Sequence, residues 1–287
     1  MNPEKNNIKL VECPRDAMQG WSDYIPVEKK IIYLNSLLKV GFDTLDFGSF
    51  VSPKAIPQLR DTKEVLKGID LLNSSTKLLA IIANVRGAEE AAEYEEISFL
   101  GFPFSVSEEF QKRNANSTIN ESLKRVEEIQ SLCIKKRKEL VVYISMGFGN
   151  PYGELWNSDI VIHWVKHLAK MGIKIIALAD TIGVSNPENI TELFSNLIPE
   201  FPAIEFGAHI HSSPERWKEK IIACERSGCI RYDSALKGIG GCPMADNELV
   251  GNLATENLVN YFGGTAFLGL DSDAFKESLR IANDIFH

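Results

Sequence analysis

The chain has 287 residues, of which 44% are hydrophobic and 24% charged, and its formal net charge is −8. This composition is typical of a folded globular protein and excludes a disordered chain. An acidic chain also lacks the dense basic face that nucleic-acid binding requires, so we expect a small-molecule ligand and no nucleic acid.

The cysteines and the apolar stretches indicate the cellular setting. The five cysteines show no tight pairing pattern, which favours free thiols over a disulfide framework. Residues 1–9 are polar, and apolar stretches such as residues 78–85 are far shorter than the ~18 residues that cross a bilayer. We therefore expect a cytoplasmic protein without a membrane segment.

Short β-branched or apolar runs recur along the chain at fairly even spacing and predict strands. They cover residues 8–13, 44–48, 78–84, 96–100, 140–146, 173–179, 204–211 and 229–236. Longer segments separate them, and two of these, residues 27–40 and 117–133, carry apolar side chains on one helical face. Alternating strands and helices predict a parallel sheet in an α/β protein.

The chain shows no sign of a division into domains. No Gly/Ser-rich linker, charge block or strong internal repeat interrupts it, so we expect one domain over residues 1–287. Eight strand–helix units predict a (β/α)8 TIM barrel of about residues 8–262, followed by a short C-terminal helical extension, residues 263–287. An open doubly wound sheet is the competing interpretation, and both folds place their chemistry at the carboxyl ends of strands.

Polar residues concentrate at these predicted strand ends, which packing alone does not explain. In chain order they are Glu12, Arg15, Asp16, Asp46, Ser145, Asp180, Thr181, His209, His211 and, in the glycine-rich run after the last strand, Cys242.

His209 and His211 lie two residues apart on the seventh predicted strand, so their imidazoles point to the same face. Such a pair suits a divalent metal with histidine and carboxylate ligands. The alternative is a pair of solvated or core histidines without a metal.

Other candidate residues have similar alternatives. Asp16 is a potential oxygen ligand and Arg15 a potential stabiliser of an oxyanion, or the two form an ordinary salt-bridged turn. Cys242 lies in a glycine-rich loop, where a thiol transfers a proton or simply packs. Asn252 offers a neutral oxygen ligand, or it caps a helix that starts near Gly251.

These residues resemble the 3-hydroxy-3-methylglutaryl-CoA (HMG-CoA) lyases, within the metal-dependent TIM-barrel lyases and Claisen condensing enzymes. The matching runs occur in the family's order over nearly the whole chain. They are residues 11–19 (VECPRDAMQ), 49–54 (SFVSPK), 180–184 (DTIGV), 209–211 (HIH), 240–243 (GGCP) and 251–256 (GNLATE).

The resemblance implies Mg²⁺ or Mn²⁺ held by Asp16, His209, His211 and Asn252. It further implies retro-Claisen cleavage of HMG-CoA to acetoacetate and acetyl-CoA, a role in leucine catabolism and a homodimer. By the same resemblance, His209 would accept a proton from the acyl-CoA substrate, Arg15 would stabilise the enolate, and Cys242 would deliver a proton. Glu12 and Asp180 would support the site near the substrate. The residues expected to bind the substrate are Arg15, Gln19, Asp46, Ser145 and Thr181.

Departures from the lyase pattern leave other activities open. Ala17 replaces a glycine, residues 20–22 (GWS) replace a polar segment that includes a lysine, and Ser212 replaces an aspartate. Residues 244–250 depart from the lyase loop, and residues 248–252 (ELVGN) have a faint likeness to the Glu-x-x-Gly-Asn pattern of the condensing enzymes. A related acyl-CoA lyase, a condensing enzyme that joins acetyl-CoA to a 2-oxo acid, and a non-catalytic barrel remain the alternatives.

Overall fold

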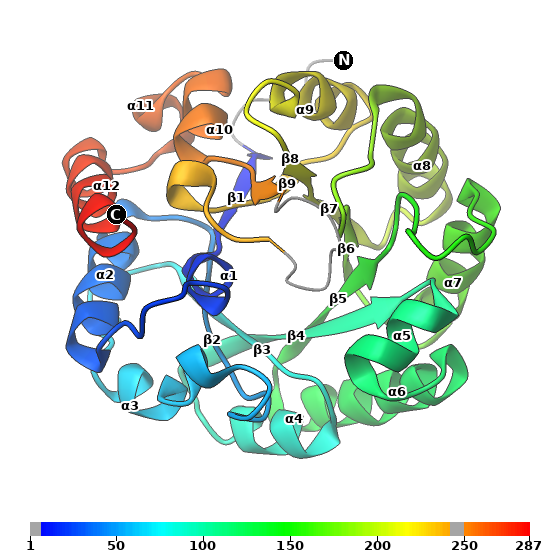
Figure 1. Cartoon of the computed structure of the whole chain (residues 1–287), viewed down its shortest axis with the longest axis horizontal. Coiled ribbons are helices and arrows are strands. Elements are labelled where there is room, and N and C mark those ends of the chain that lie inside the picture. The colour runs from blue at the N-terminus through cyan, green and yellow to red at the C-terminus, as the bar shows by residue number, and fades with distance from the viewer. Residues whose placement is uncertain (1–6, 242–249) are drawn as a thin grey trace.

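The computed structural model describes residues 7–241 and 250–287, so Cys242 lies outside the described residues. The strands form one closed parallel barrel (Figure 1). In order around the barrel they are β1 (Lys9–Glu12), β2 (Thr44–Ser49), β3 (Lys77–Ile81), β4 (Ile97–Ser105), β5 (Glu139–Ser145), β6 (Ile175–Ala179), β7 (Glu205–His209) and β9 (Arg231–Ser234).

Pairing between the first and the last of these strands closes the barrel. β1 lies parallel to β9 over its full length, with Lys9 opposite Arg231 and Glu12 opposite Ser234. This pairing confirms the TIM barrel and shows that the open-sheet interpretation was wrong. Each of the eight strand predictions overlaps one barrel strand.

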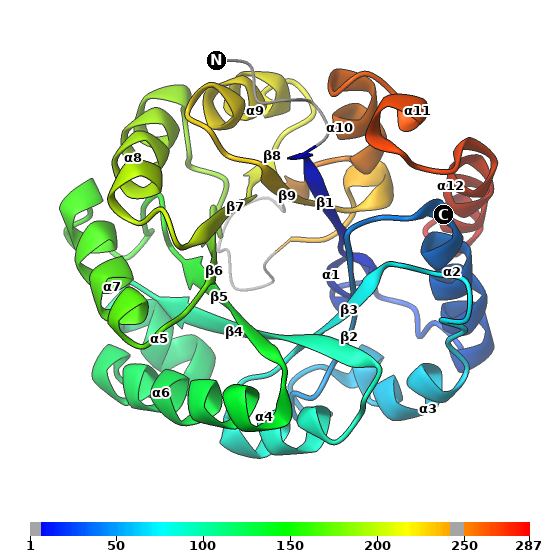
Figure 2. The ribbon, with the colours of Figure 1, turned by 180° about the vertical axis from the view of Figure 1, so that it is seen from behind.

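Most of the helices form a ring around the barrel, while α1 lies closer to its centre (Figures 1 and 2). In chain order the helices are α1 (Pro14–Gln19), α2 (Val27–Val40), α3 (Thr62–Lys67), α4 (Val85–Ala92), α5 (Glu108–Ala115), α6 (Ile119–Lys136), α7 (Ser158–Lys170), α8 (Pro187–Glu200), α9 (Trp217–Arg226), α10 (Thr255–Tyr261), α11 (Thr265–Leu268) and α12 (Ser272–Ile285).

Local capping explains several helix starts. The Thr118 hydroxyl accepts from the Glu121 amide while the Glu121 carboxylate accepts from the Thr118 amide, a capping box that begins α6. Asparagines at positions 84, 157 and 186 cap α4, α7 and α8, each by accepting a backbone N–H through its side-chain oxygen, and Asn186 forms a second capping box with Asn189.

The core has two parts because strand side chains alternate in direction. Outward-facing strand residues pack with the helices in one large apolar layer. Inward-facing residues fill the barrel itself: Leu79, Phe99, Val141, Tyr143, Ile175 and Ala177. The barrel is therefore packed inside, and its open space lies at an end.

The C-terminal helix α12 lies beside α2 in both views (Figures 1 and 2). The Ser278 hydroxyl donates to the Ser36 hydroxyl at 3.0 Å, and the Asp271 amide donates to the Val40 carbonyl. The ring of Phe286 meets Trp21 edge-on, with ring centroids 5.2 Å apart. Residues from both ends of the chain thus pack together.

Two further strands form a small sheet outside the barrel. β8 (His211–Ser212) pairs antiparallel with β10 (Gly251–Asn252), so His211 lies directly opposite Asn252. Among the described residues no helix is long and apolar enough to cross a membrane. The four described cysteines are buried and free, as predicted from their spacing.

Candidate active site

A cavity of about 360 Å³ opens at the carboxyl ends of the barrel strands. Its lining includes many of the residues predicted from sequence: Arg15, Asp16, Gln19, Ser145, Thr181, His209 and His211. The apolar part of the lining includes Ile56, Ile81 and Ala179. Helix α5 contributes three further lining residues, of which Arg113 and Asn114 are polar. The strand-end prediction therefore located one shared site.

His209 and His211 converge, although not as residues of one strand. His209 ends β7, and His211 begins β8, so the prediction that both lie on the seventh strand was wrong. The apolar run continues through Ile210, which hides the break. Their Nε2 atoms lie 3.2 Å apart.

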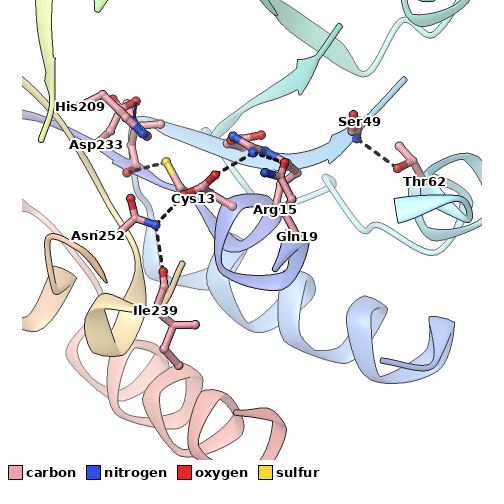
Figure 3. Close-up of polar contacts among 12 residues, drawn as sticks. Cys13, Arg15, Gln19, Ser49, Thr62, His209, Asp233, Ile239 and Asn252 are labelled. Carbon is pink, nitrogen blue, oxygen red and sulfur yellow. Dashed lines mark hydrogen bonds and ion pairs between the residues drawn. The ribbon is translucent and has the colours of Figure 1, made fainter. Parts of the chain in front are cut away.

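Asp16 completes a three-residue cluster with these histidines. One possible ligand atom from each of Asp16, His209 and His211 lies within 4.8 Å of the others. Asn252 borders the cluster: its Nδ2 donates to Asp16 Oδ2 at 2.7 Å and to the Ile239 carbonyl at 2.9 Å (Figure 3). Because the nitrogen is committed in this way, the side-chain oxygen of Asn252 is its available ligand atom.

Asn252 does not cap a helix. The following helix α10 begins at Thr255, and Ala254 occupies its N-cap position. The alternative interpretation of Asn252 as a capping residue was therefore wrong.

The donor set fits a divalent cation. Metal–nitrogen and metal–oxygen bonds of about 2.1 Å place neighbouring ligand atoms roughly 3.0–3.4 Å apart, and the two Nε2 atoms have that separation. Burial and the neighbouring His209 lower the pKa of His211 to about 4, so its imidazole is neutral at pH 7, as metal binding requires. Its Nδ1 is buried and has no partner within the described residues.

Asp233 holds the other edge of His209. Its Oδ2 lies 3.1 Å from His209 Nδ1 (Figure 3), so Nδ1 carries the hydrogen. Nε2 is left to face His211. Burial lowers the pKa of His209, but the hydrogen bond and charge of Asp233 outweigh it and raise that pKa overall. Asp233 was not predicted as a site residue, because it lies within the last predicted strand, residues 229–236, and not at its end.

Arg15 is fixed by three side chains. Its Nε and Nη2 both donate to Asp46 Oδ2, at 2.9 and 2.6 Å, while Nη1 donates to Asp16 Oδ1 at 2.8 Å and to Gln19 Oε1 at 2.9 Å. These bonds use four of the five guanidinium N–H groups. The second N–H of Nη2 has no hydrogen-bond partner among the described residues and is available to a ligand. Burial raises the pKa of Asp46 to about 6 against the opposing charge of Arg15.

Comparisons with known proteins show which family the chain belongs to. A family model described as HMGL-like matches residues 7–271. The chain belongs to the HMGL-like family. It is 34% identical over 260 residues, 90% of this chain and 85% of the relative, to a hydroxymethylglutaryl-CoA lyase of Bacillus subtilis. The mitochondrial enzyme of that name from Mus musculus is 32% identical over 96% of this chain and 84% of its own.

A solved structure has the same fold. An HMG-CoA lyase from Acinetobacter baumannii, in complex with coenzyme A and 3-methylmalate, superposes with a TM-score of 0.89 at 30% identity. The match covers 99% of this chain and 93% of that one. The expected family and fold are thereby confirmed, and the chain is an enzyme of the HMGL-like family.

Four of the predicted residues that the structure describes lie outside the cavity lining: Glu12, Asp46, Asp180 and Asn252. Asp46 and Asn252 contact Arg15 and Asp16, which do line it. Glu12 is fully buried and accepts from the Leu236 amide at 2.8 Å and from the Thr255 hydroxyl at 2.5 Å. It therefore joins β1 to the segments after β9, and these hydrogen bonds involve neither Arg15 nor a histidine. Burial raises the pKa of Glu12 to about 8.

Asp180 also acts from behind the cavity. Its carboxylate accepts from the amide and hydroxyl of Ser185 and from Lys220 Nζ. Its neighbour Thr181 does line the cavity, and the Thr181 hydroxyl accepts from the Met146 amide at 2.8 Å. The predicted strand end after β6 thus supplies one cavity residue and one supporting residue.

Proposed function

We propose that this HMGL-like enzyme is an HMG-CoA lyase that requires Mg²⁺ or Mn²⁺. One observation carries the proposal: the cluster of Asp16, His209 and His211 lines the same cavity as Arg15, which donates to Asp16. The relatives named hydroxymethylglutaryl-CoA lyase are 32–34% identical over most of the chain, which supports the same reaction class.

Asp16, His209, His211 and Asn252 would hold the metal ion. Bound there, a divalent ion would raise the acidity of a hydroxyl group and neutralise a carboxylate of the substrate. Asp233 would hold the His209 ring in the tautomer that binds metal. Arg15 would orient Asp16 through the 2.8 Å bond from Nη1 to Oδ1.

The reaction breaks the bond between C2 and C3 of HMG-CoA. The 3-hydroxyl loses its proton, its oxygen becomes the ketone of acetoacetate, and the electrons of the broken bond form the enolate of acetyl-CoA. The remaining Nη2 hydrogen of Arg15 would donate to that enolate oxygen. Protonation at carbon then gives acetyl-CoA, the step for which the resemblance implies Cys242.

Cleavage also requires a group that accepts the proton of the 3-hydroxyl. His209 is the expected acceptor, but its Nδ1 faces Asp233 and its Nε2 belongs to the ligand cluster. Metal binding and proton transfer at Nε2 therefore exclude each other at any instant. We therefore assign His209 Nε2 to the metal, and the Asp233 variant described in the Discussion separates that role from proton transfer.

An assay of the purified protein tests this function. With HMG-CoA, thiol protection and a panel of divalent metals, we expect acetoacetate and acetyl-CoA in equal amounts. Asp16→Asn and His209→Ala should each abolish the reaction. If HMG-CoA is unchanged while acetyl-CoA and a 2-oxo acid release free thiol, the chain is instead a condensing enzyme.

The remaining assignments are proposals too. We propose a homodimer with an acyl-CoA substrate, and gel filtration with light scattering tests the dimer. Relatives include both mitochondrial and cytoplasmic enzymes, so the cytoplasmic location stays a prediction.

A further inference from the structure

Lys220 is a buried cation behind the histidine pair. It lies on α9, which neighbours β8 in Figures 1 and 2, and its side chain is only 1% exposed. Removing an ammonium group from water is costly unless every N–H finds a partner and the charge is balanced. Lys220 meets both conditions.

Each of the three ammonium hydrogens has an acceptor. Lys220 Nζ donates to Asp180 Oδ2 at 2.9 Å, to the His211 carbonyl at 2.8 Å and to the Gly183 carbonyl at 3.2 Å. The Asp180 carboxylate balances the charge and is itself fully buried. The cation therefore joins the end of β6, the following turn and the first residue of β8.

This junction bears on both histidines. The Asp180 amide donates to the His209 carbonyl at 2.9 Å, while Lys220 holds the His211 carbonyl. The pair of Asp180 and Lys220 thus fixes the backbone on each side of Ile210, where β7 ends and β8 begins. The 3.2 Å separation of the two Nε2 atoms depends on that backbone.

His211 needs backbone support more than His209 does. Asp233 orients the His209 ring from behind, but among residues 7–241 and 250–287 no group bonds Nδ1 of His211. The placement of the His211 ring therefore comes from its backbone, which pairs with Asn252 on one side and meets Lys220 on the other.

We propose that Lys220 is a positioning residue for the metal site, because its ammonium group holds the His211 carbonyl and so aims the His211 ring. Lys220 lines no part of the cavity and acts only through His211 and Asp180. The inference rests on the proposed metal site.

Mn²⁺ binding to the metal-free protein, measured by calorimetry, tests the role of Lys220. Wild type is measured first, and absence of binding there would contradict the proposed metal site rather than Lys220. Lys220→Met should weaken Mn²⁺ binding by about 10- to 100-fold, the usual effect of removing a residue that supports a ligand. Lys218→Met, an exposed lysine on the same helix, is the matched control and should bind within twofold of wild type.

A second variant separates positioning from charge balance. Lys220→Met leaves the Asp180 carboxylate buried without a cation, which destabilises the fold. Asp180→Asn combined with Lys220→Met removes both charges, and Asp180→Asn alone is its reference. We expect the double variant to fold and still bind Mn²⁺ at least tenfold more weakly than Asp180→Asn. Equal affinity of these two variants, or wild-type affinity of a folded Lys220→Met protein, would overturn the proposal.

Discussion

The carboxylate of Asp233 lies 3.1 Å from Nδ1 of His209, while Nε2 of the same ring faces His211. One acid therefore decides which edge of His209 carries the hydrogen and which is left to bind. A ring held in this way is a better ligand because its tautomer and orientation are fixed before a metal arrives.

Asp233→Asn should weaken Mn²⁺ binding by about tenfold or more while the protein stays folded. The new amide can donate to Nδ1, which would move the ring hydrogen to Nε2, the atom proposed to bind the metal. Calorimetry on the metal-free variant measures the affinity, and Glu215→Gln, an exposed acid, is the control. Unchanged affinity with a reduced kcat would mean that Asp233 serves proton transfer at His209 instead.

Arg15→Gln should lower kcat for HMG-CoA cleavage by about 100-fold or more, because the enolate oxygen loses its cationic donor. The substitution also leaves Asp46 buried without its partner. Arg15→Gln combined with Asp46→Asn should therefore recover stability in urea but not activity. Recovery of kcat in the double variant would show that Arg15 only balances the charge of Asp46.

Gly240 connects the glycine-rich run to the proposed metal site. Its φ is +106°, and a Cβ there would lie 2.4 Å from Asn252 Nδ2 and 3.0 Å from the Asp16 carbonyl oxygen. Gly240→Ala should therefore displace Asn252, weaken Mn²⁺ binding by about tenfold and cost roughly 1–3 kcal/mol of stability. Gly20→Ala is the matched control, since Gly20 has φ −96° and open space around its missing Cβ. Equal effects of the two substitutions would contradict this account.

Glu12 gives the fold a measurable pH dependence. Its pKa rises from 4.5 to about 8 on folding, so the folded chain holds a proton that the unfolded chain releases in that interval. Stability should therefore fall as the pH rises from 5 to 8, by about 3 kcal/mol from this group alone. Urea unfolding at both pH values should show a smaller loss for Glu12→Gln, with Glu215→Gln as control. Identical losses in wild type and Glu12→Gln would exclude this role.

Much of the fold could be predicted because strand and helix patterns are local. Turn residues separate each apolar run, and helix 27–40 was predicted with the bounds that the structure shows. The break between His209 and His211 could not be predicted, because Ile210 is as apolar as a strand residue and the small sheet depends on distant Gly251.

The cavity lining could be predicted better than its support. Arg15, Asp16 and His209 stand at strand ends, where a barrel gathers side chains. Lys220 carried a weaker signal: it shares a helical face with Trp217, Ile221 and Cys224, and a lysine on an apolar face needs a buried partner. Its partner Asp180 is 40 residues away in the chain, so only the folded structure joins them.

The most direct test of the account is a metal titration of the chelator-treated enzyme. Acetoacetate release from HMG-CoA is followed while Mn²⁺ is added back in sub-stoichiometric steps. We expect no activity without metal and a linear rise to a plateau at one ion per chain for wild type, with His211→Ala inactive at every step. Full activity of the metal-free enzyme, or no acetoacetate at any metal loading, would contradict the account.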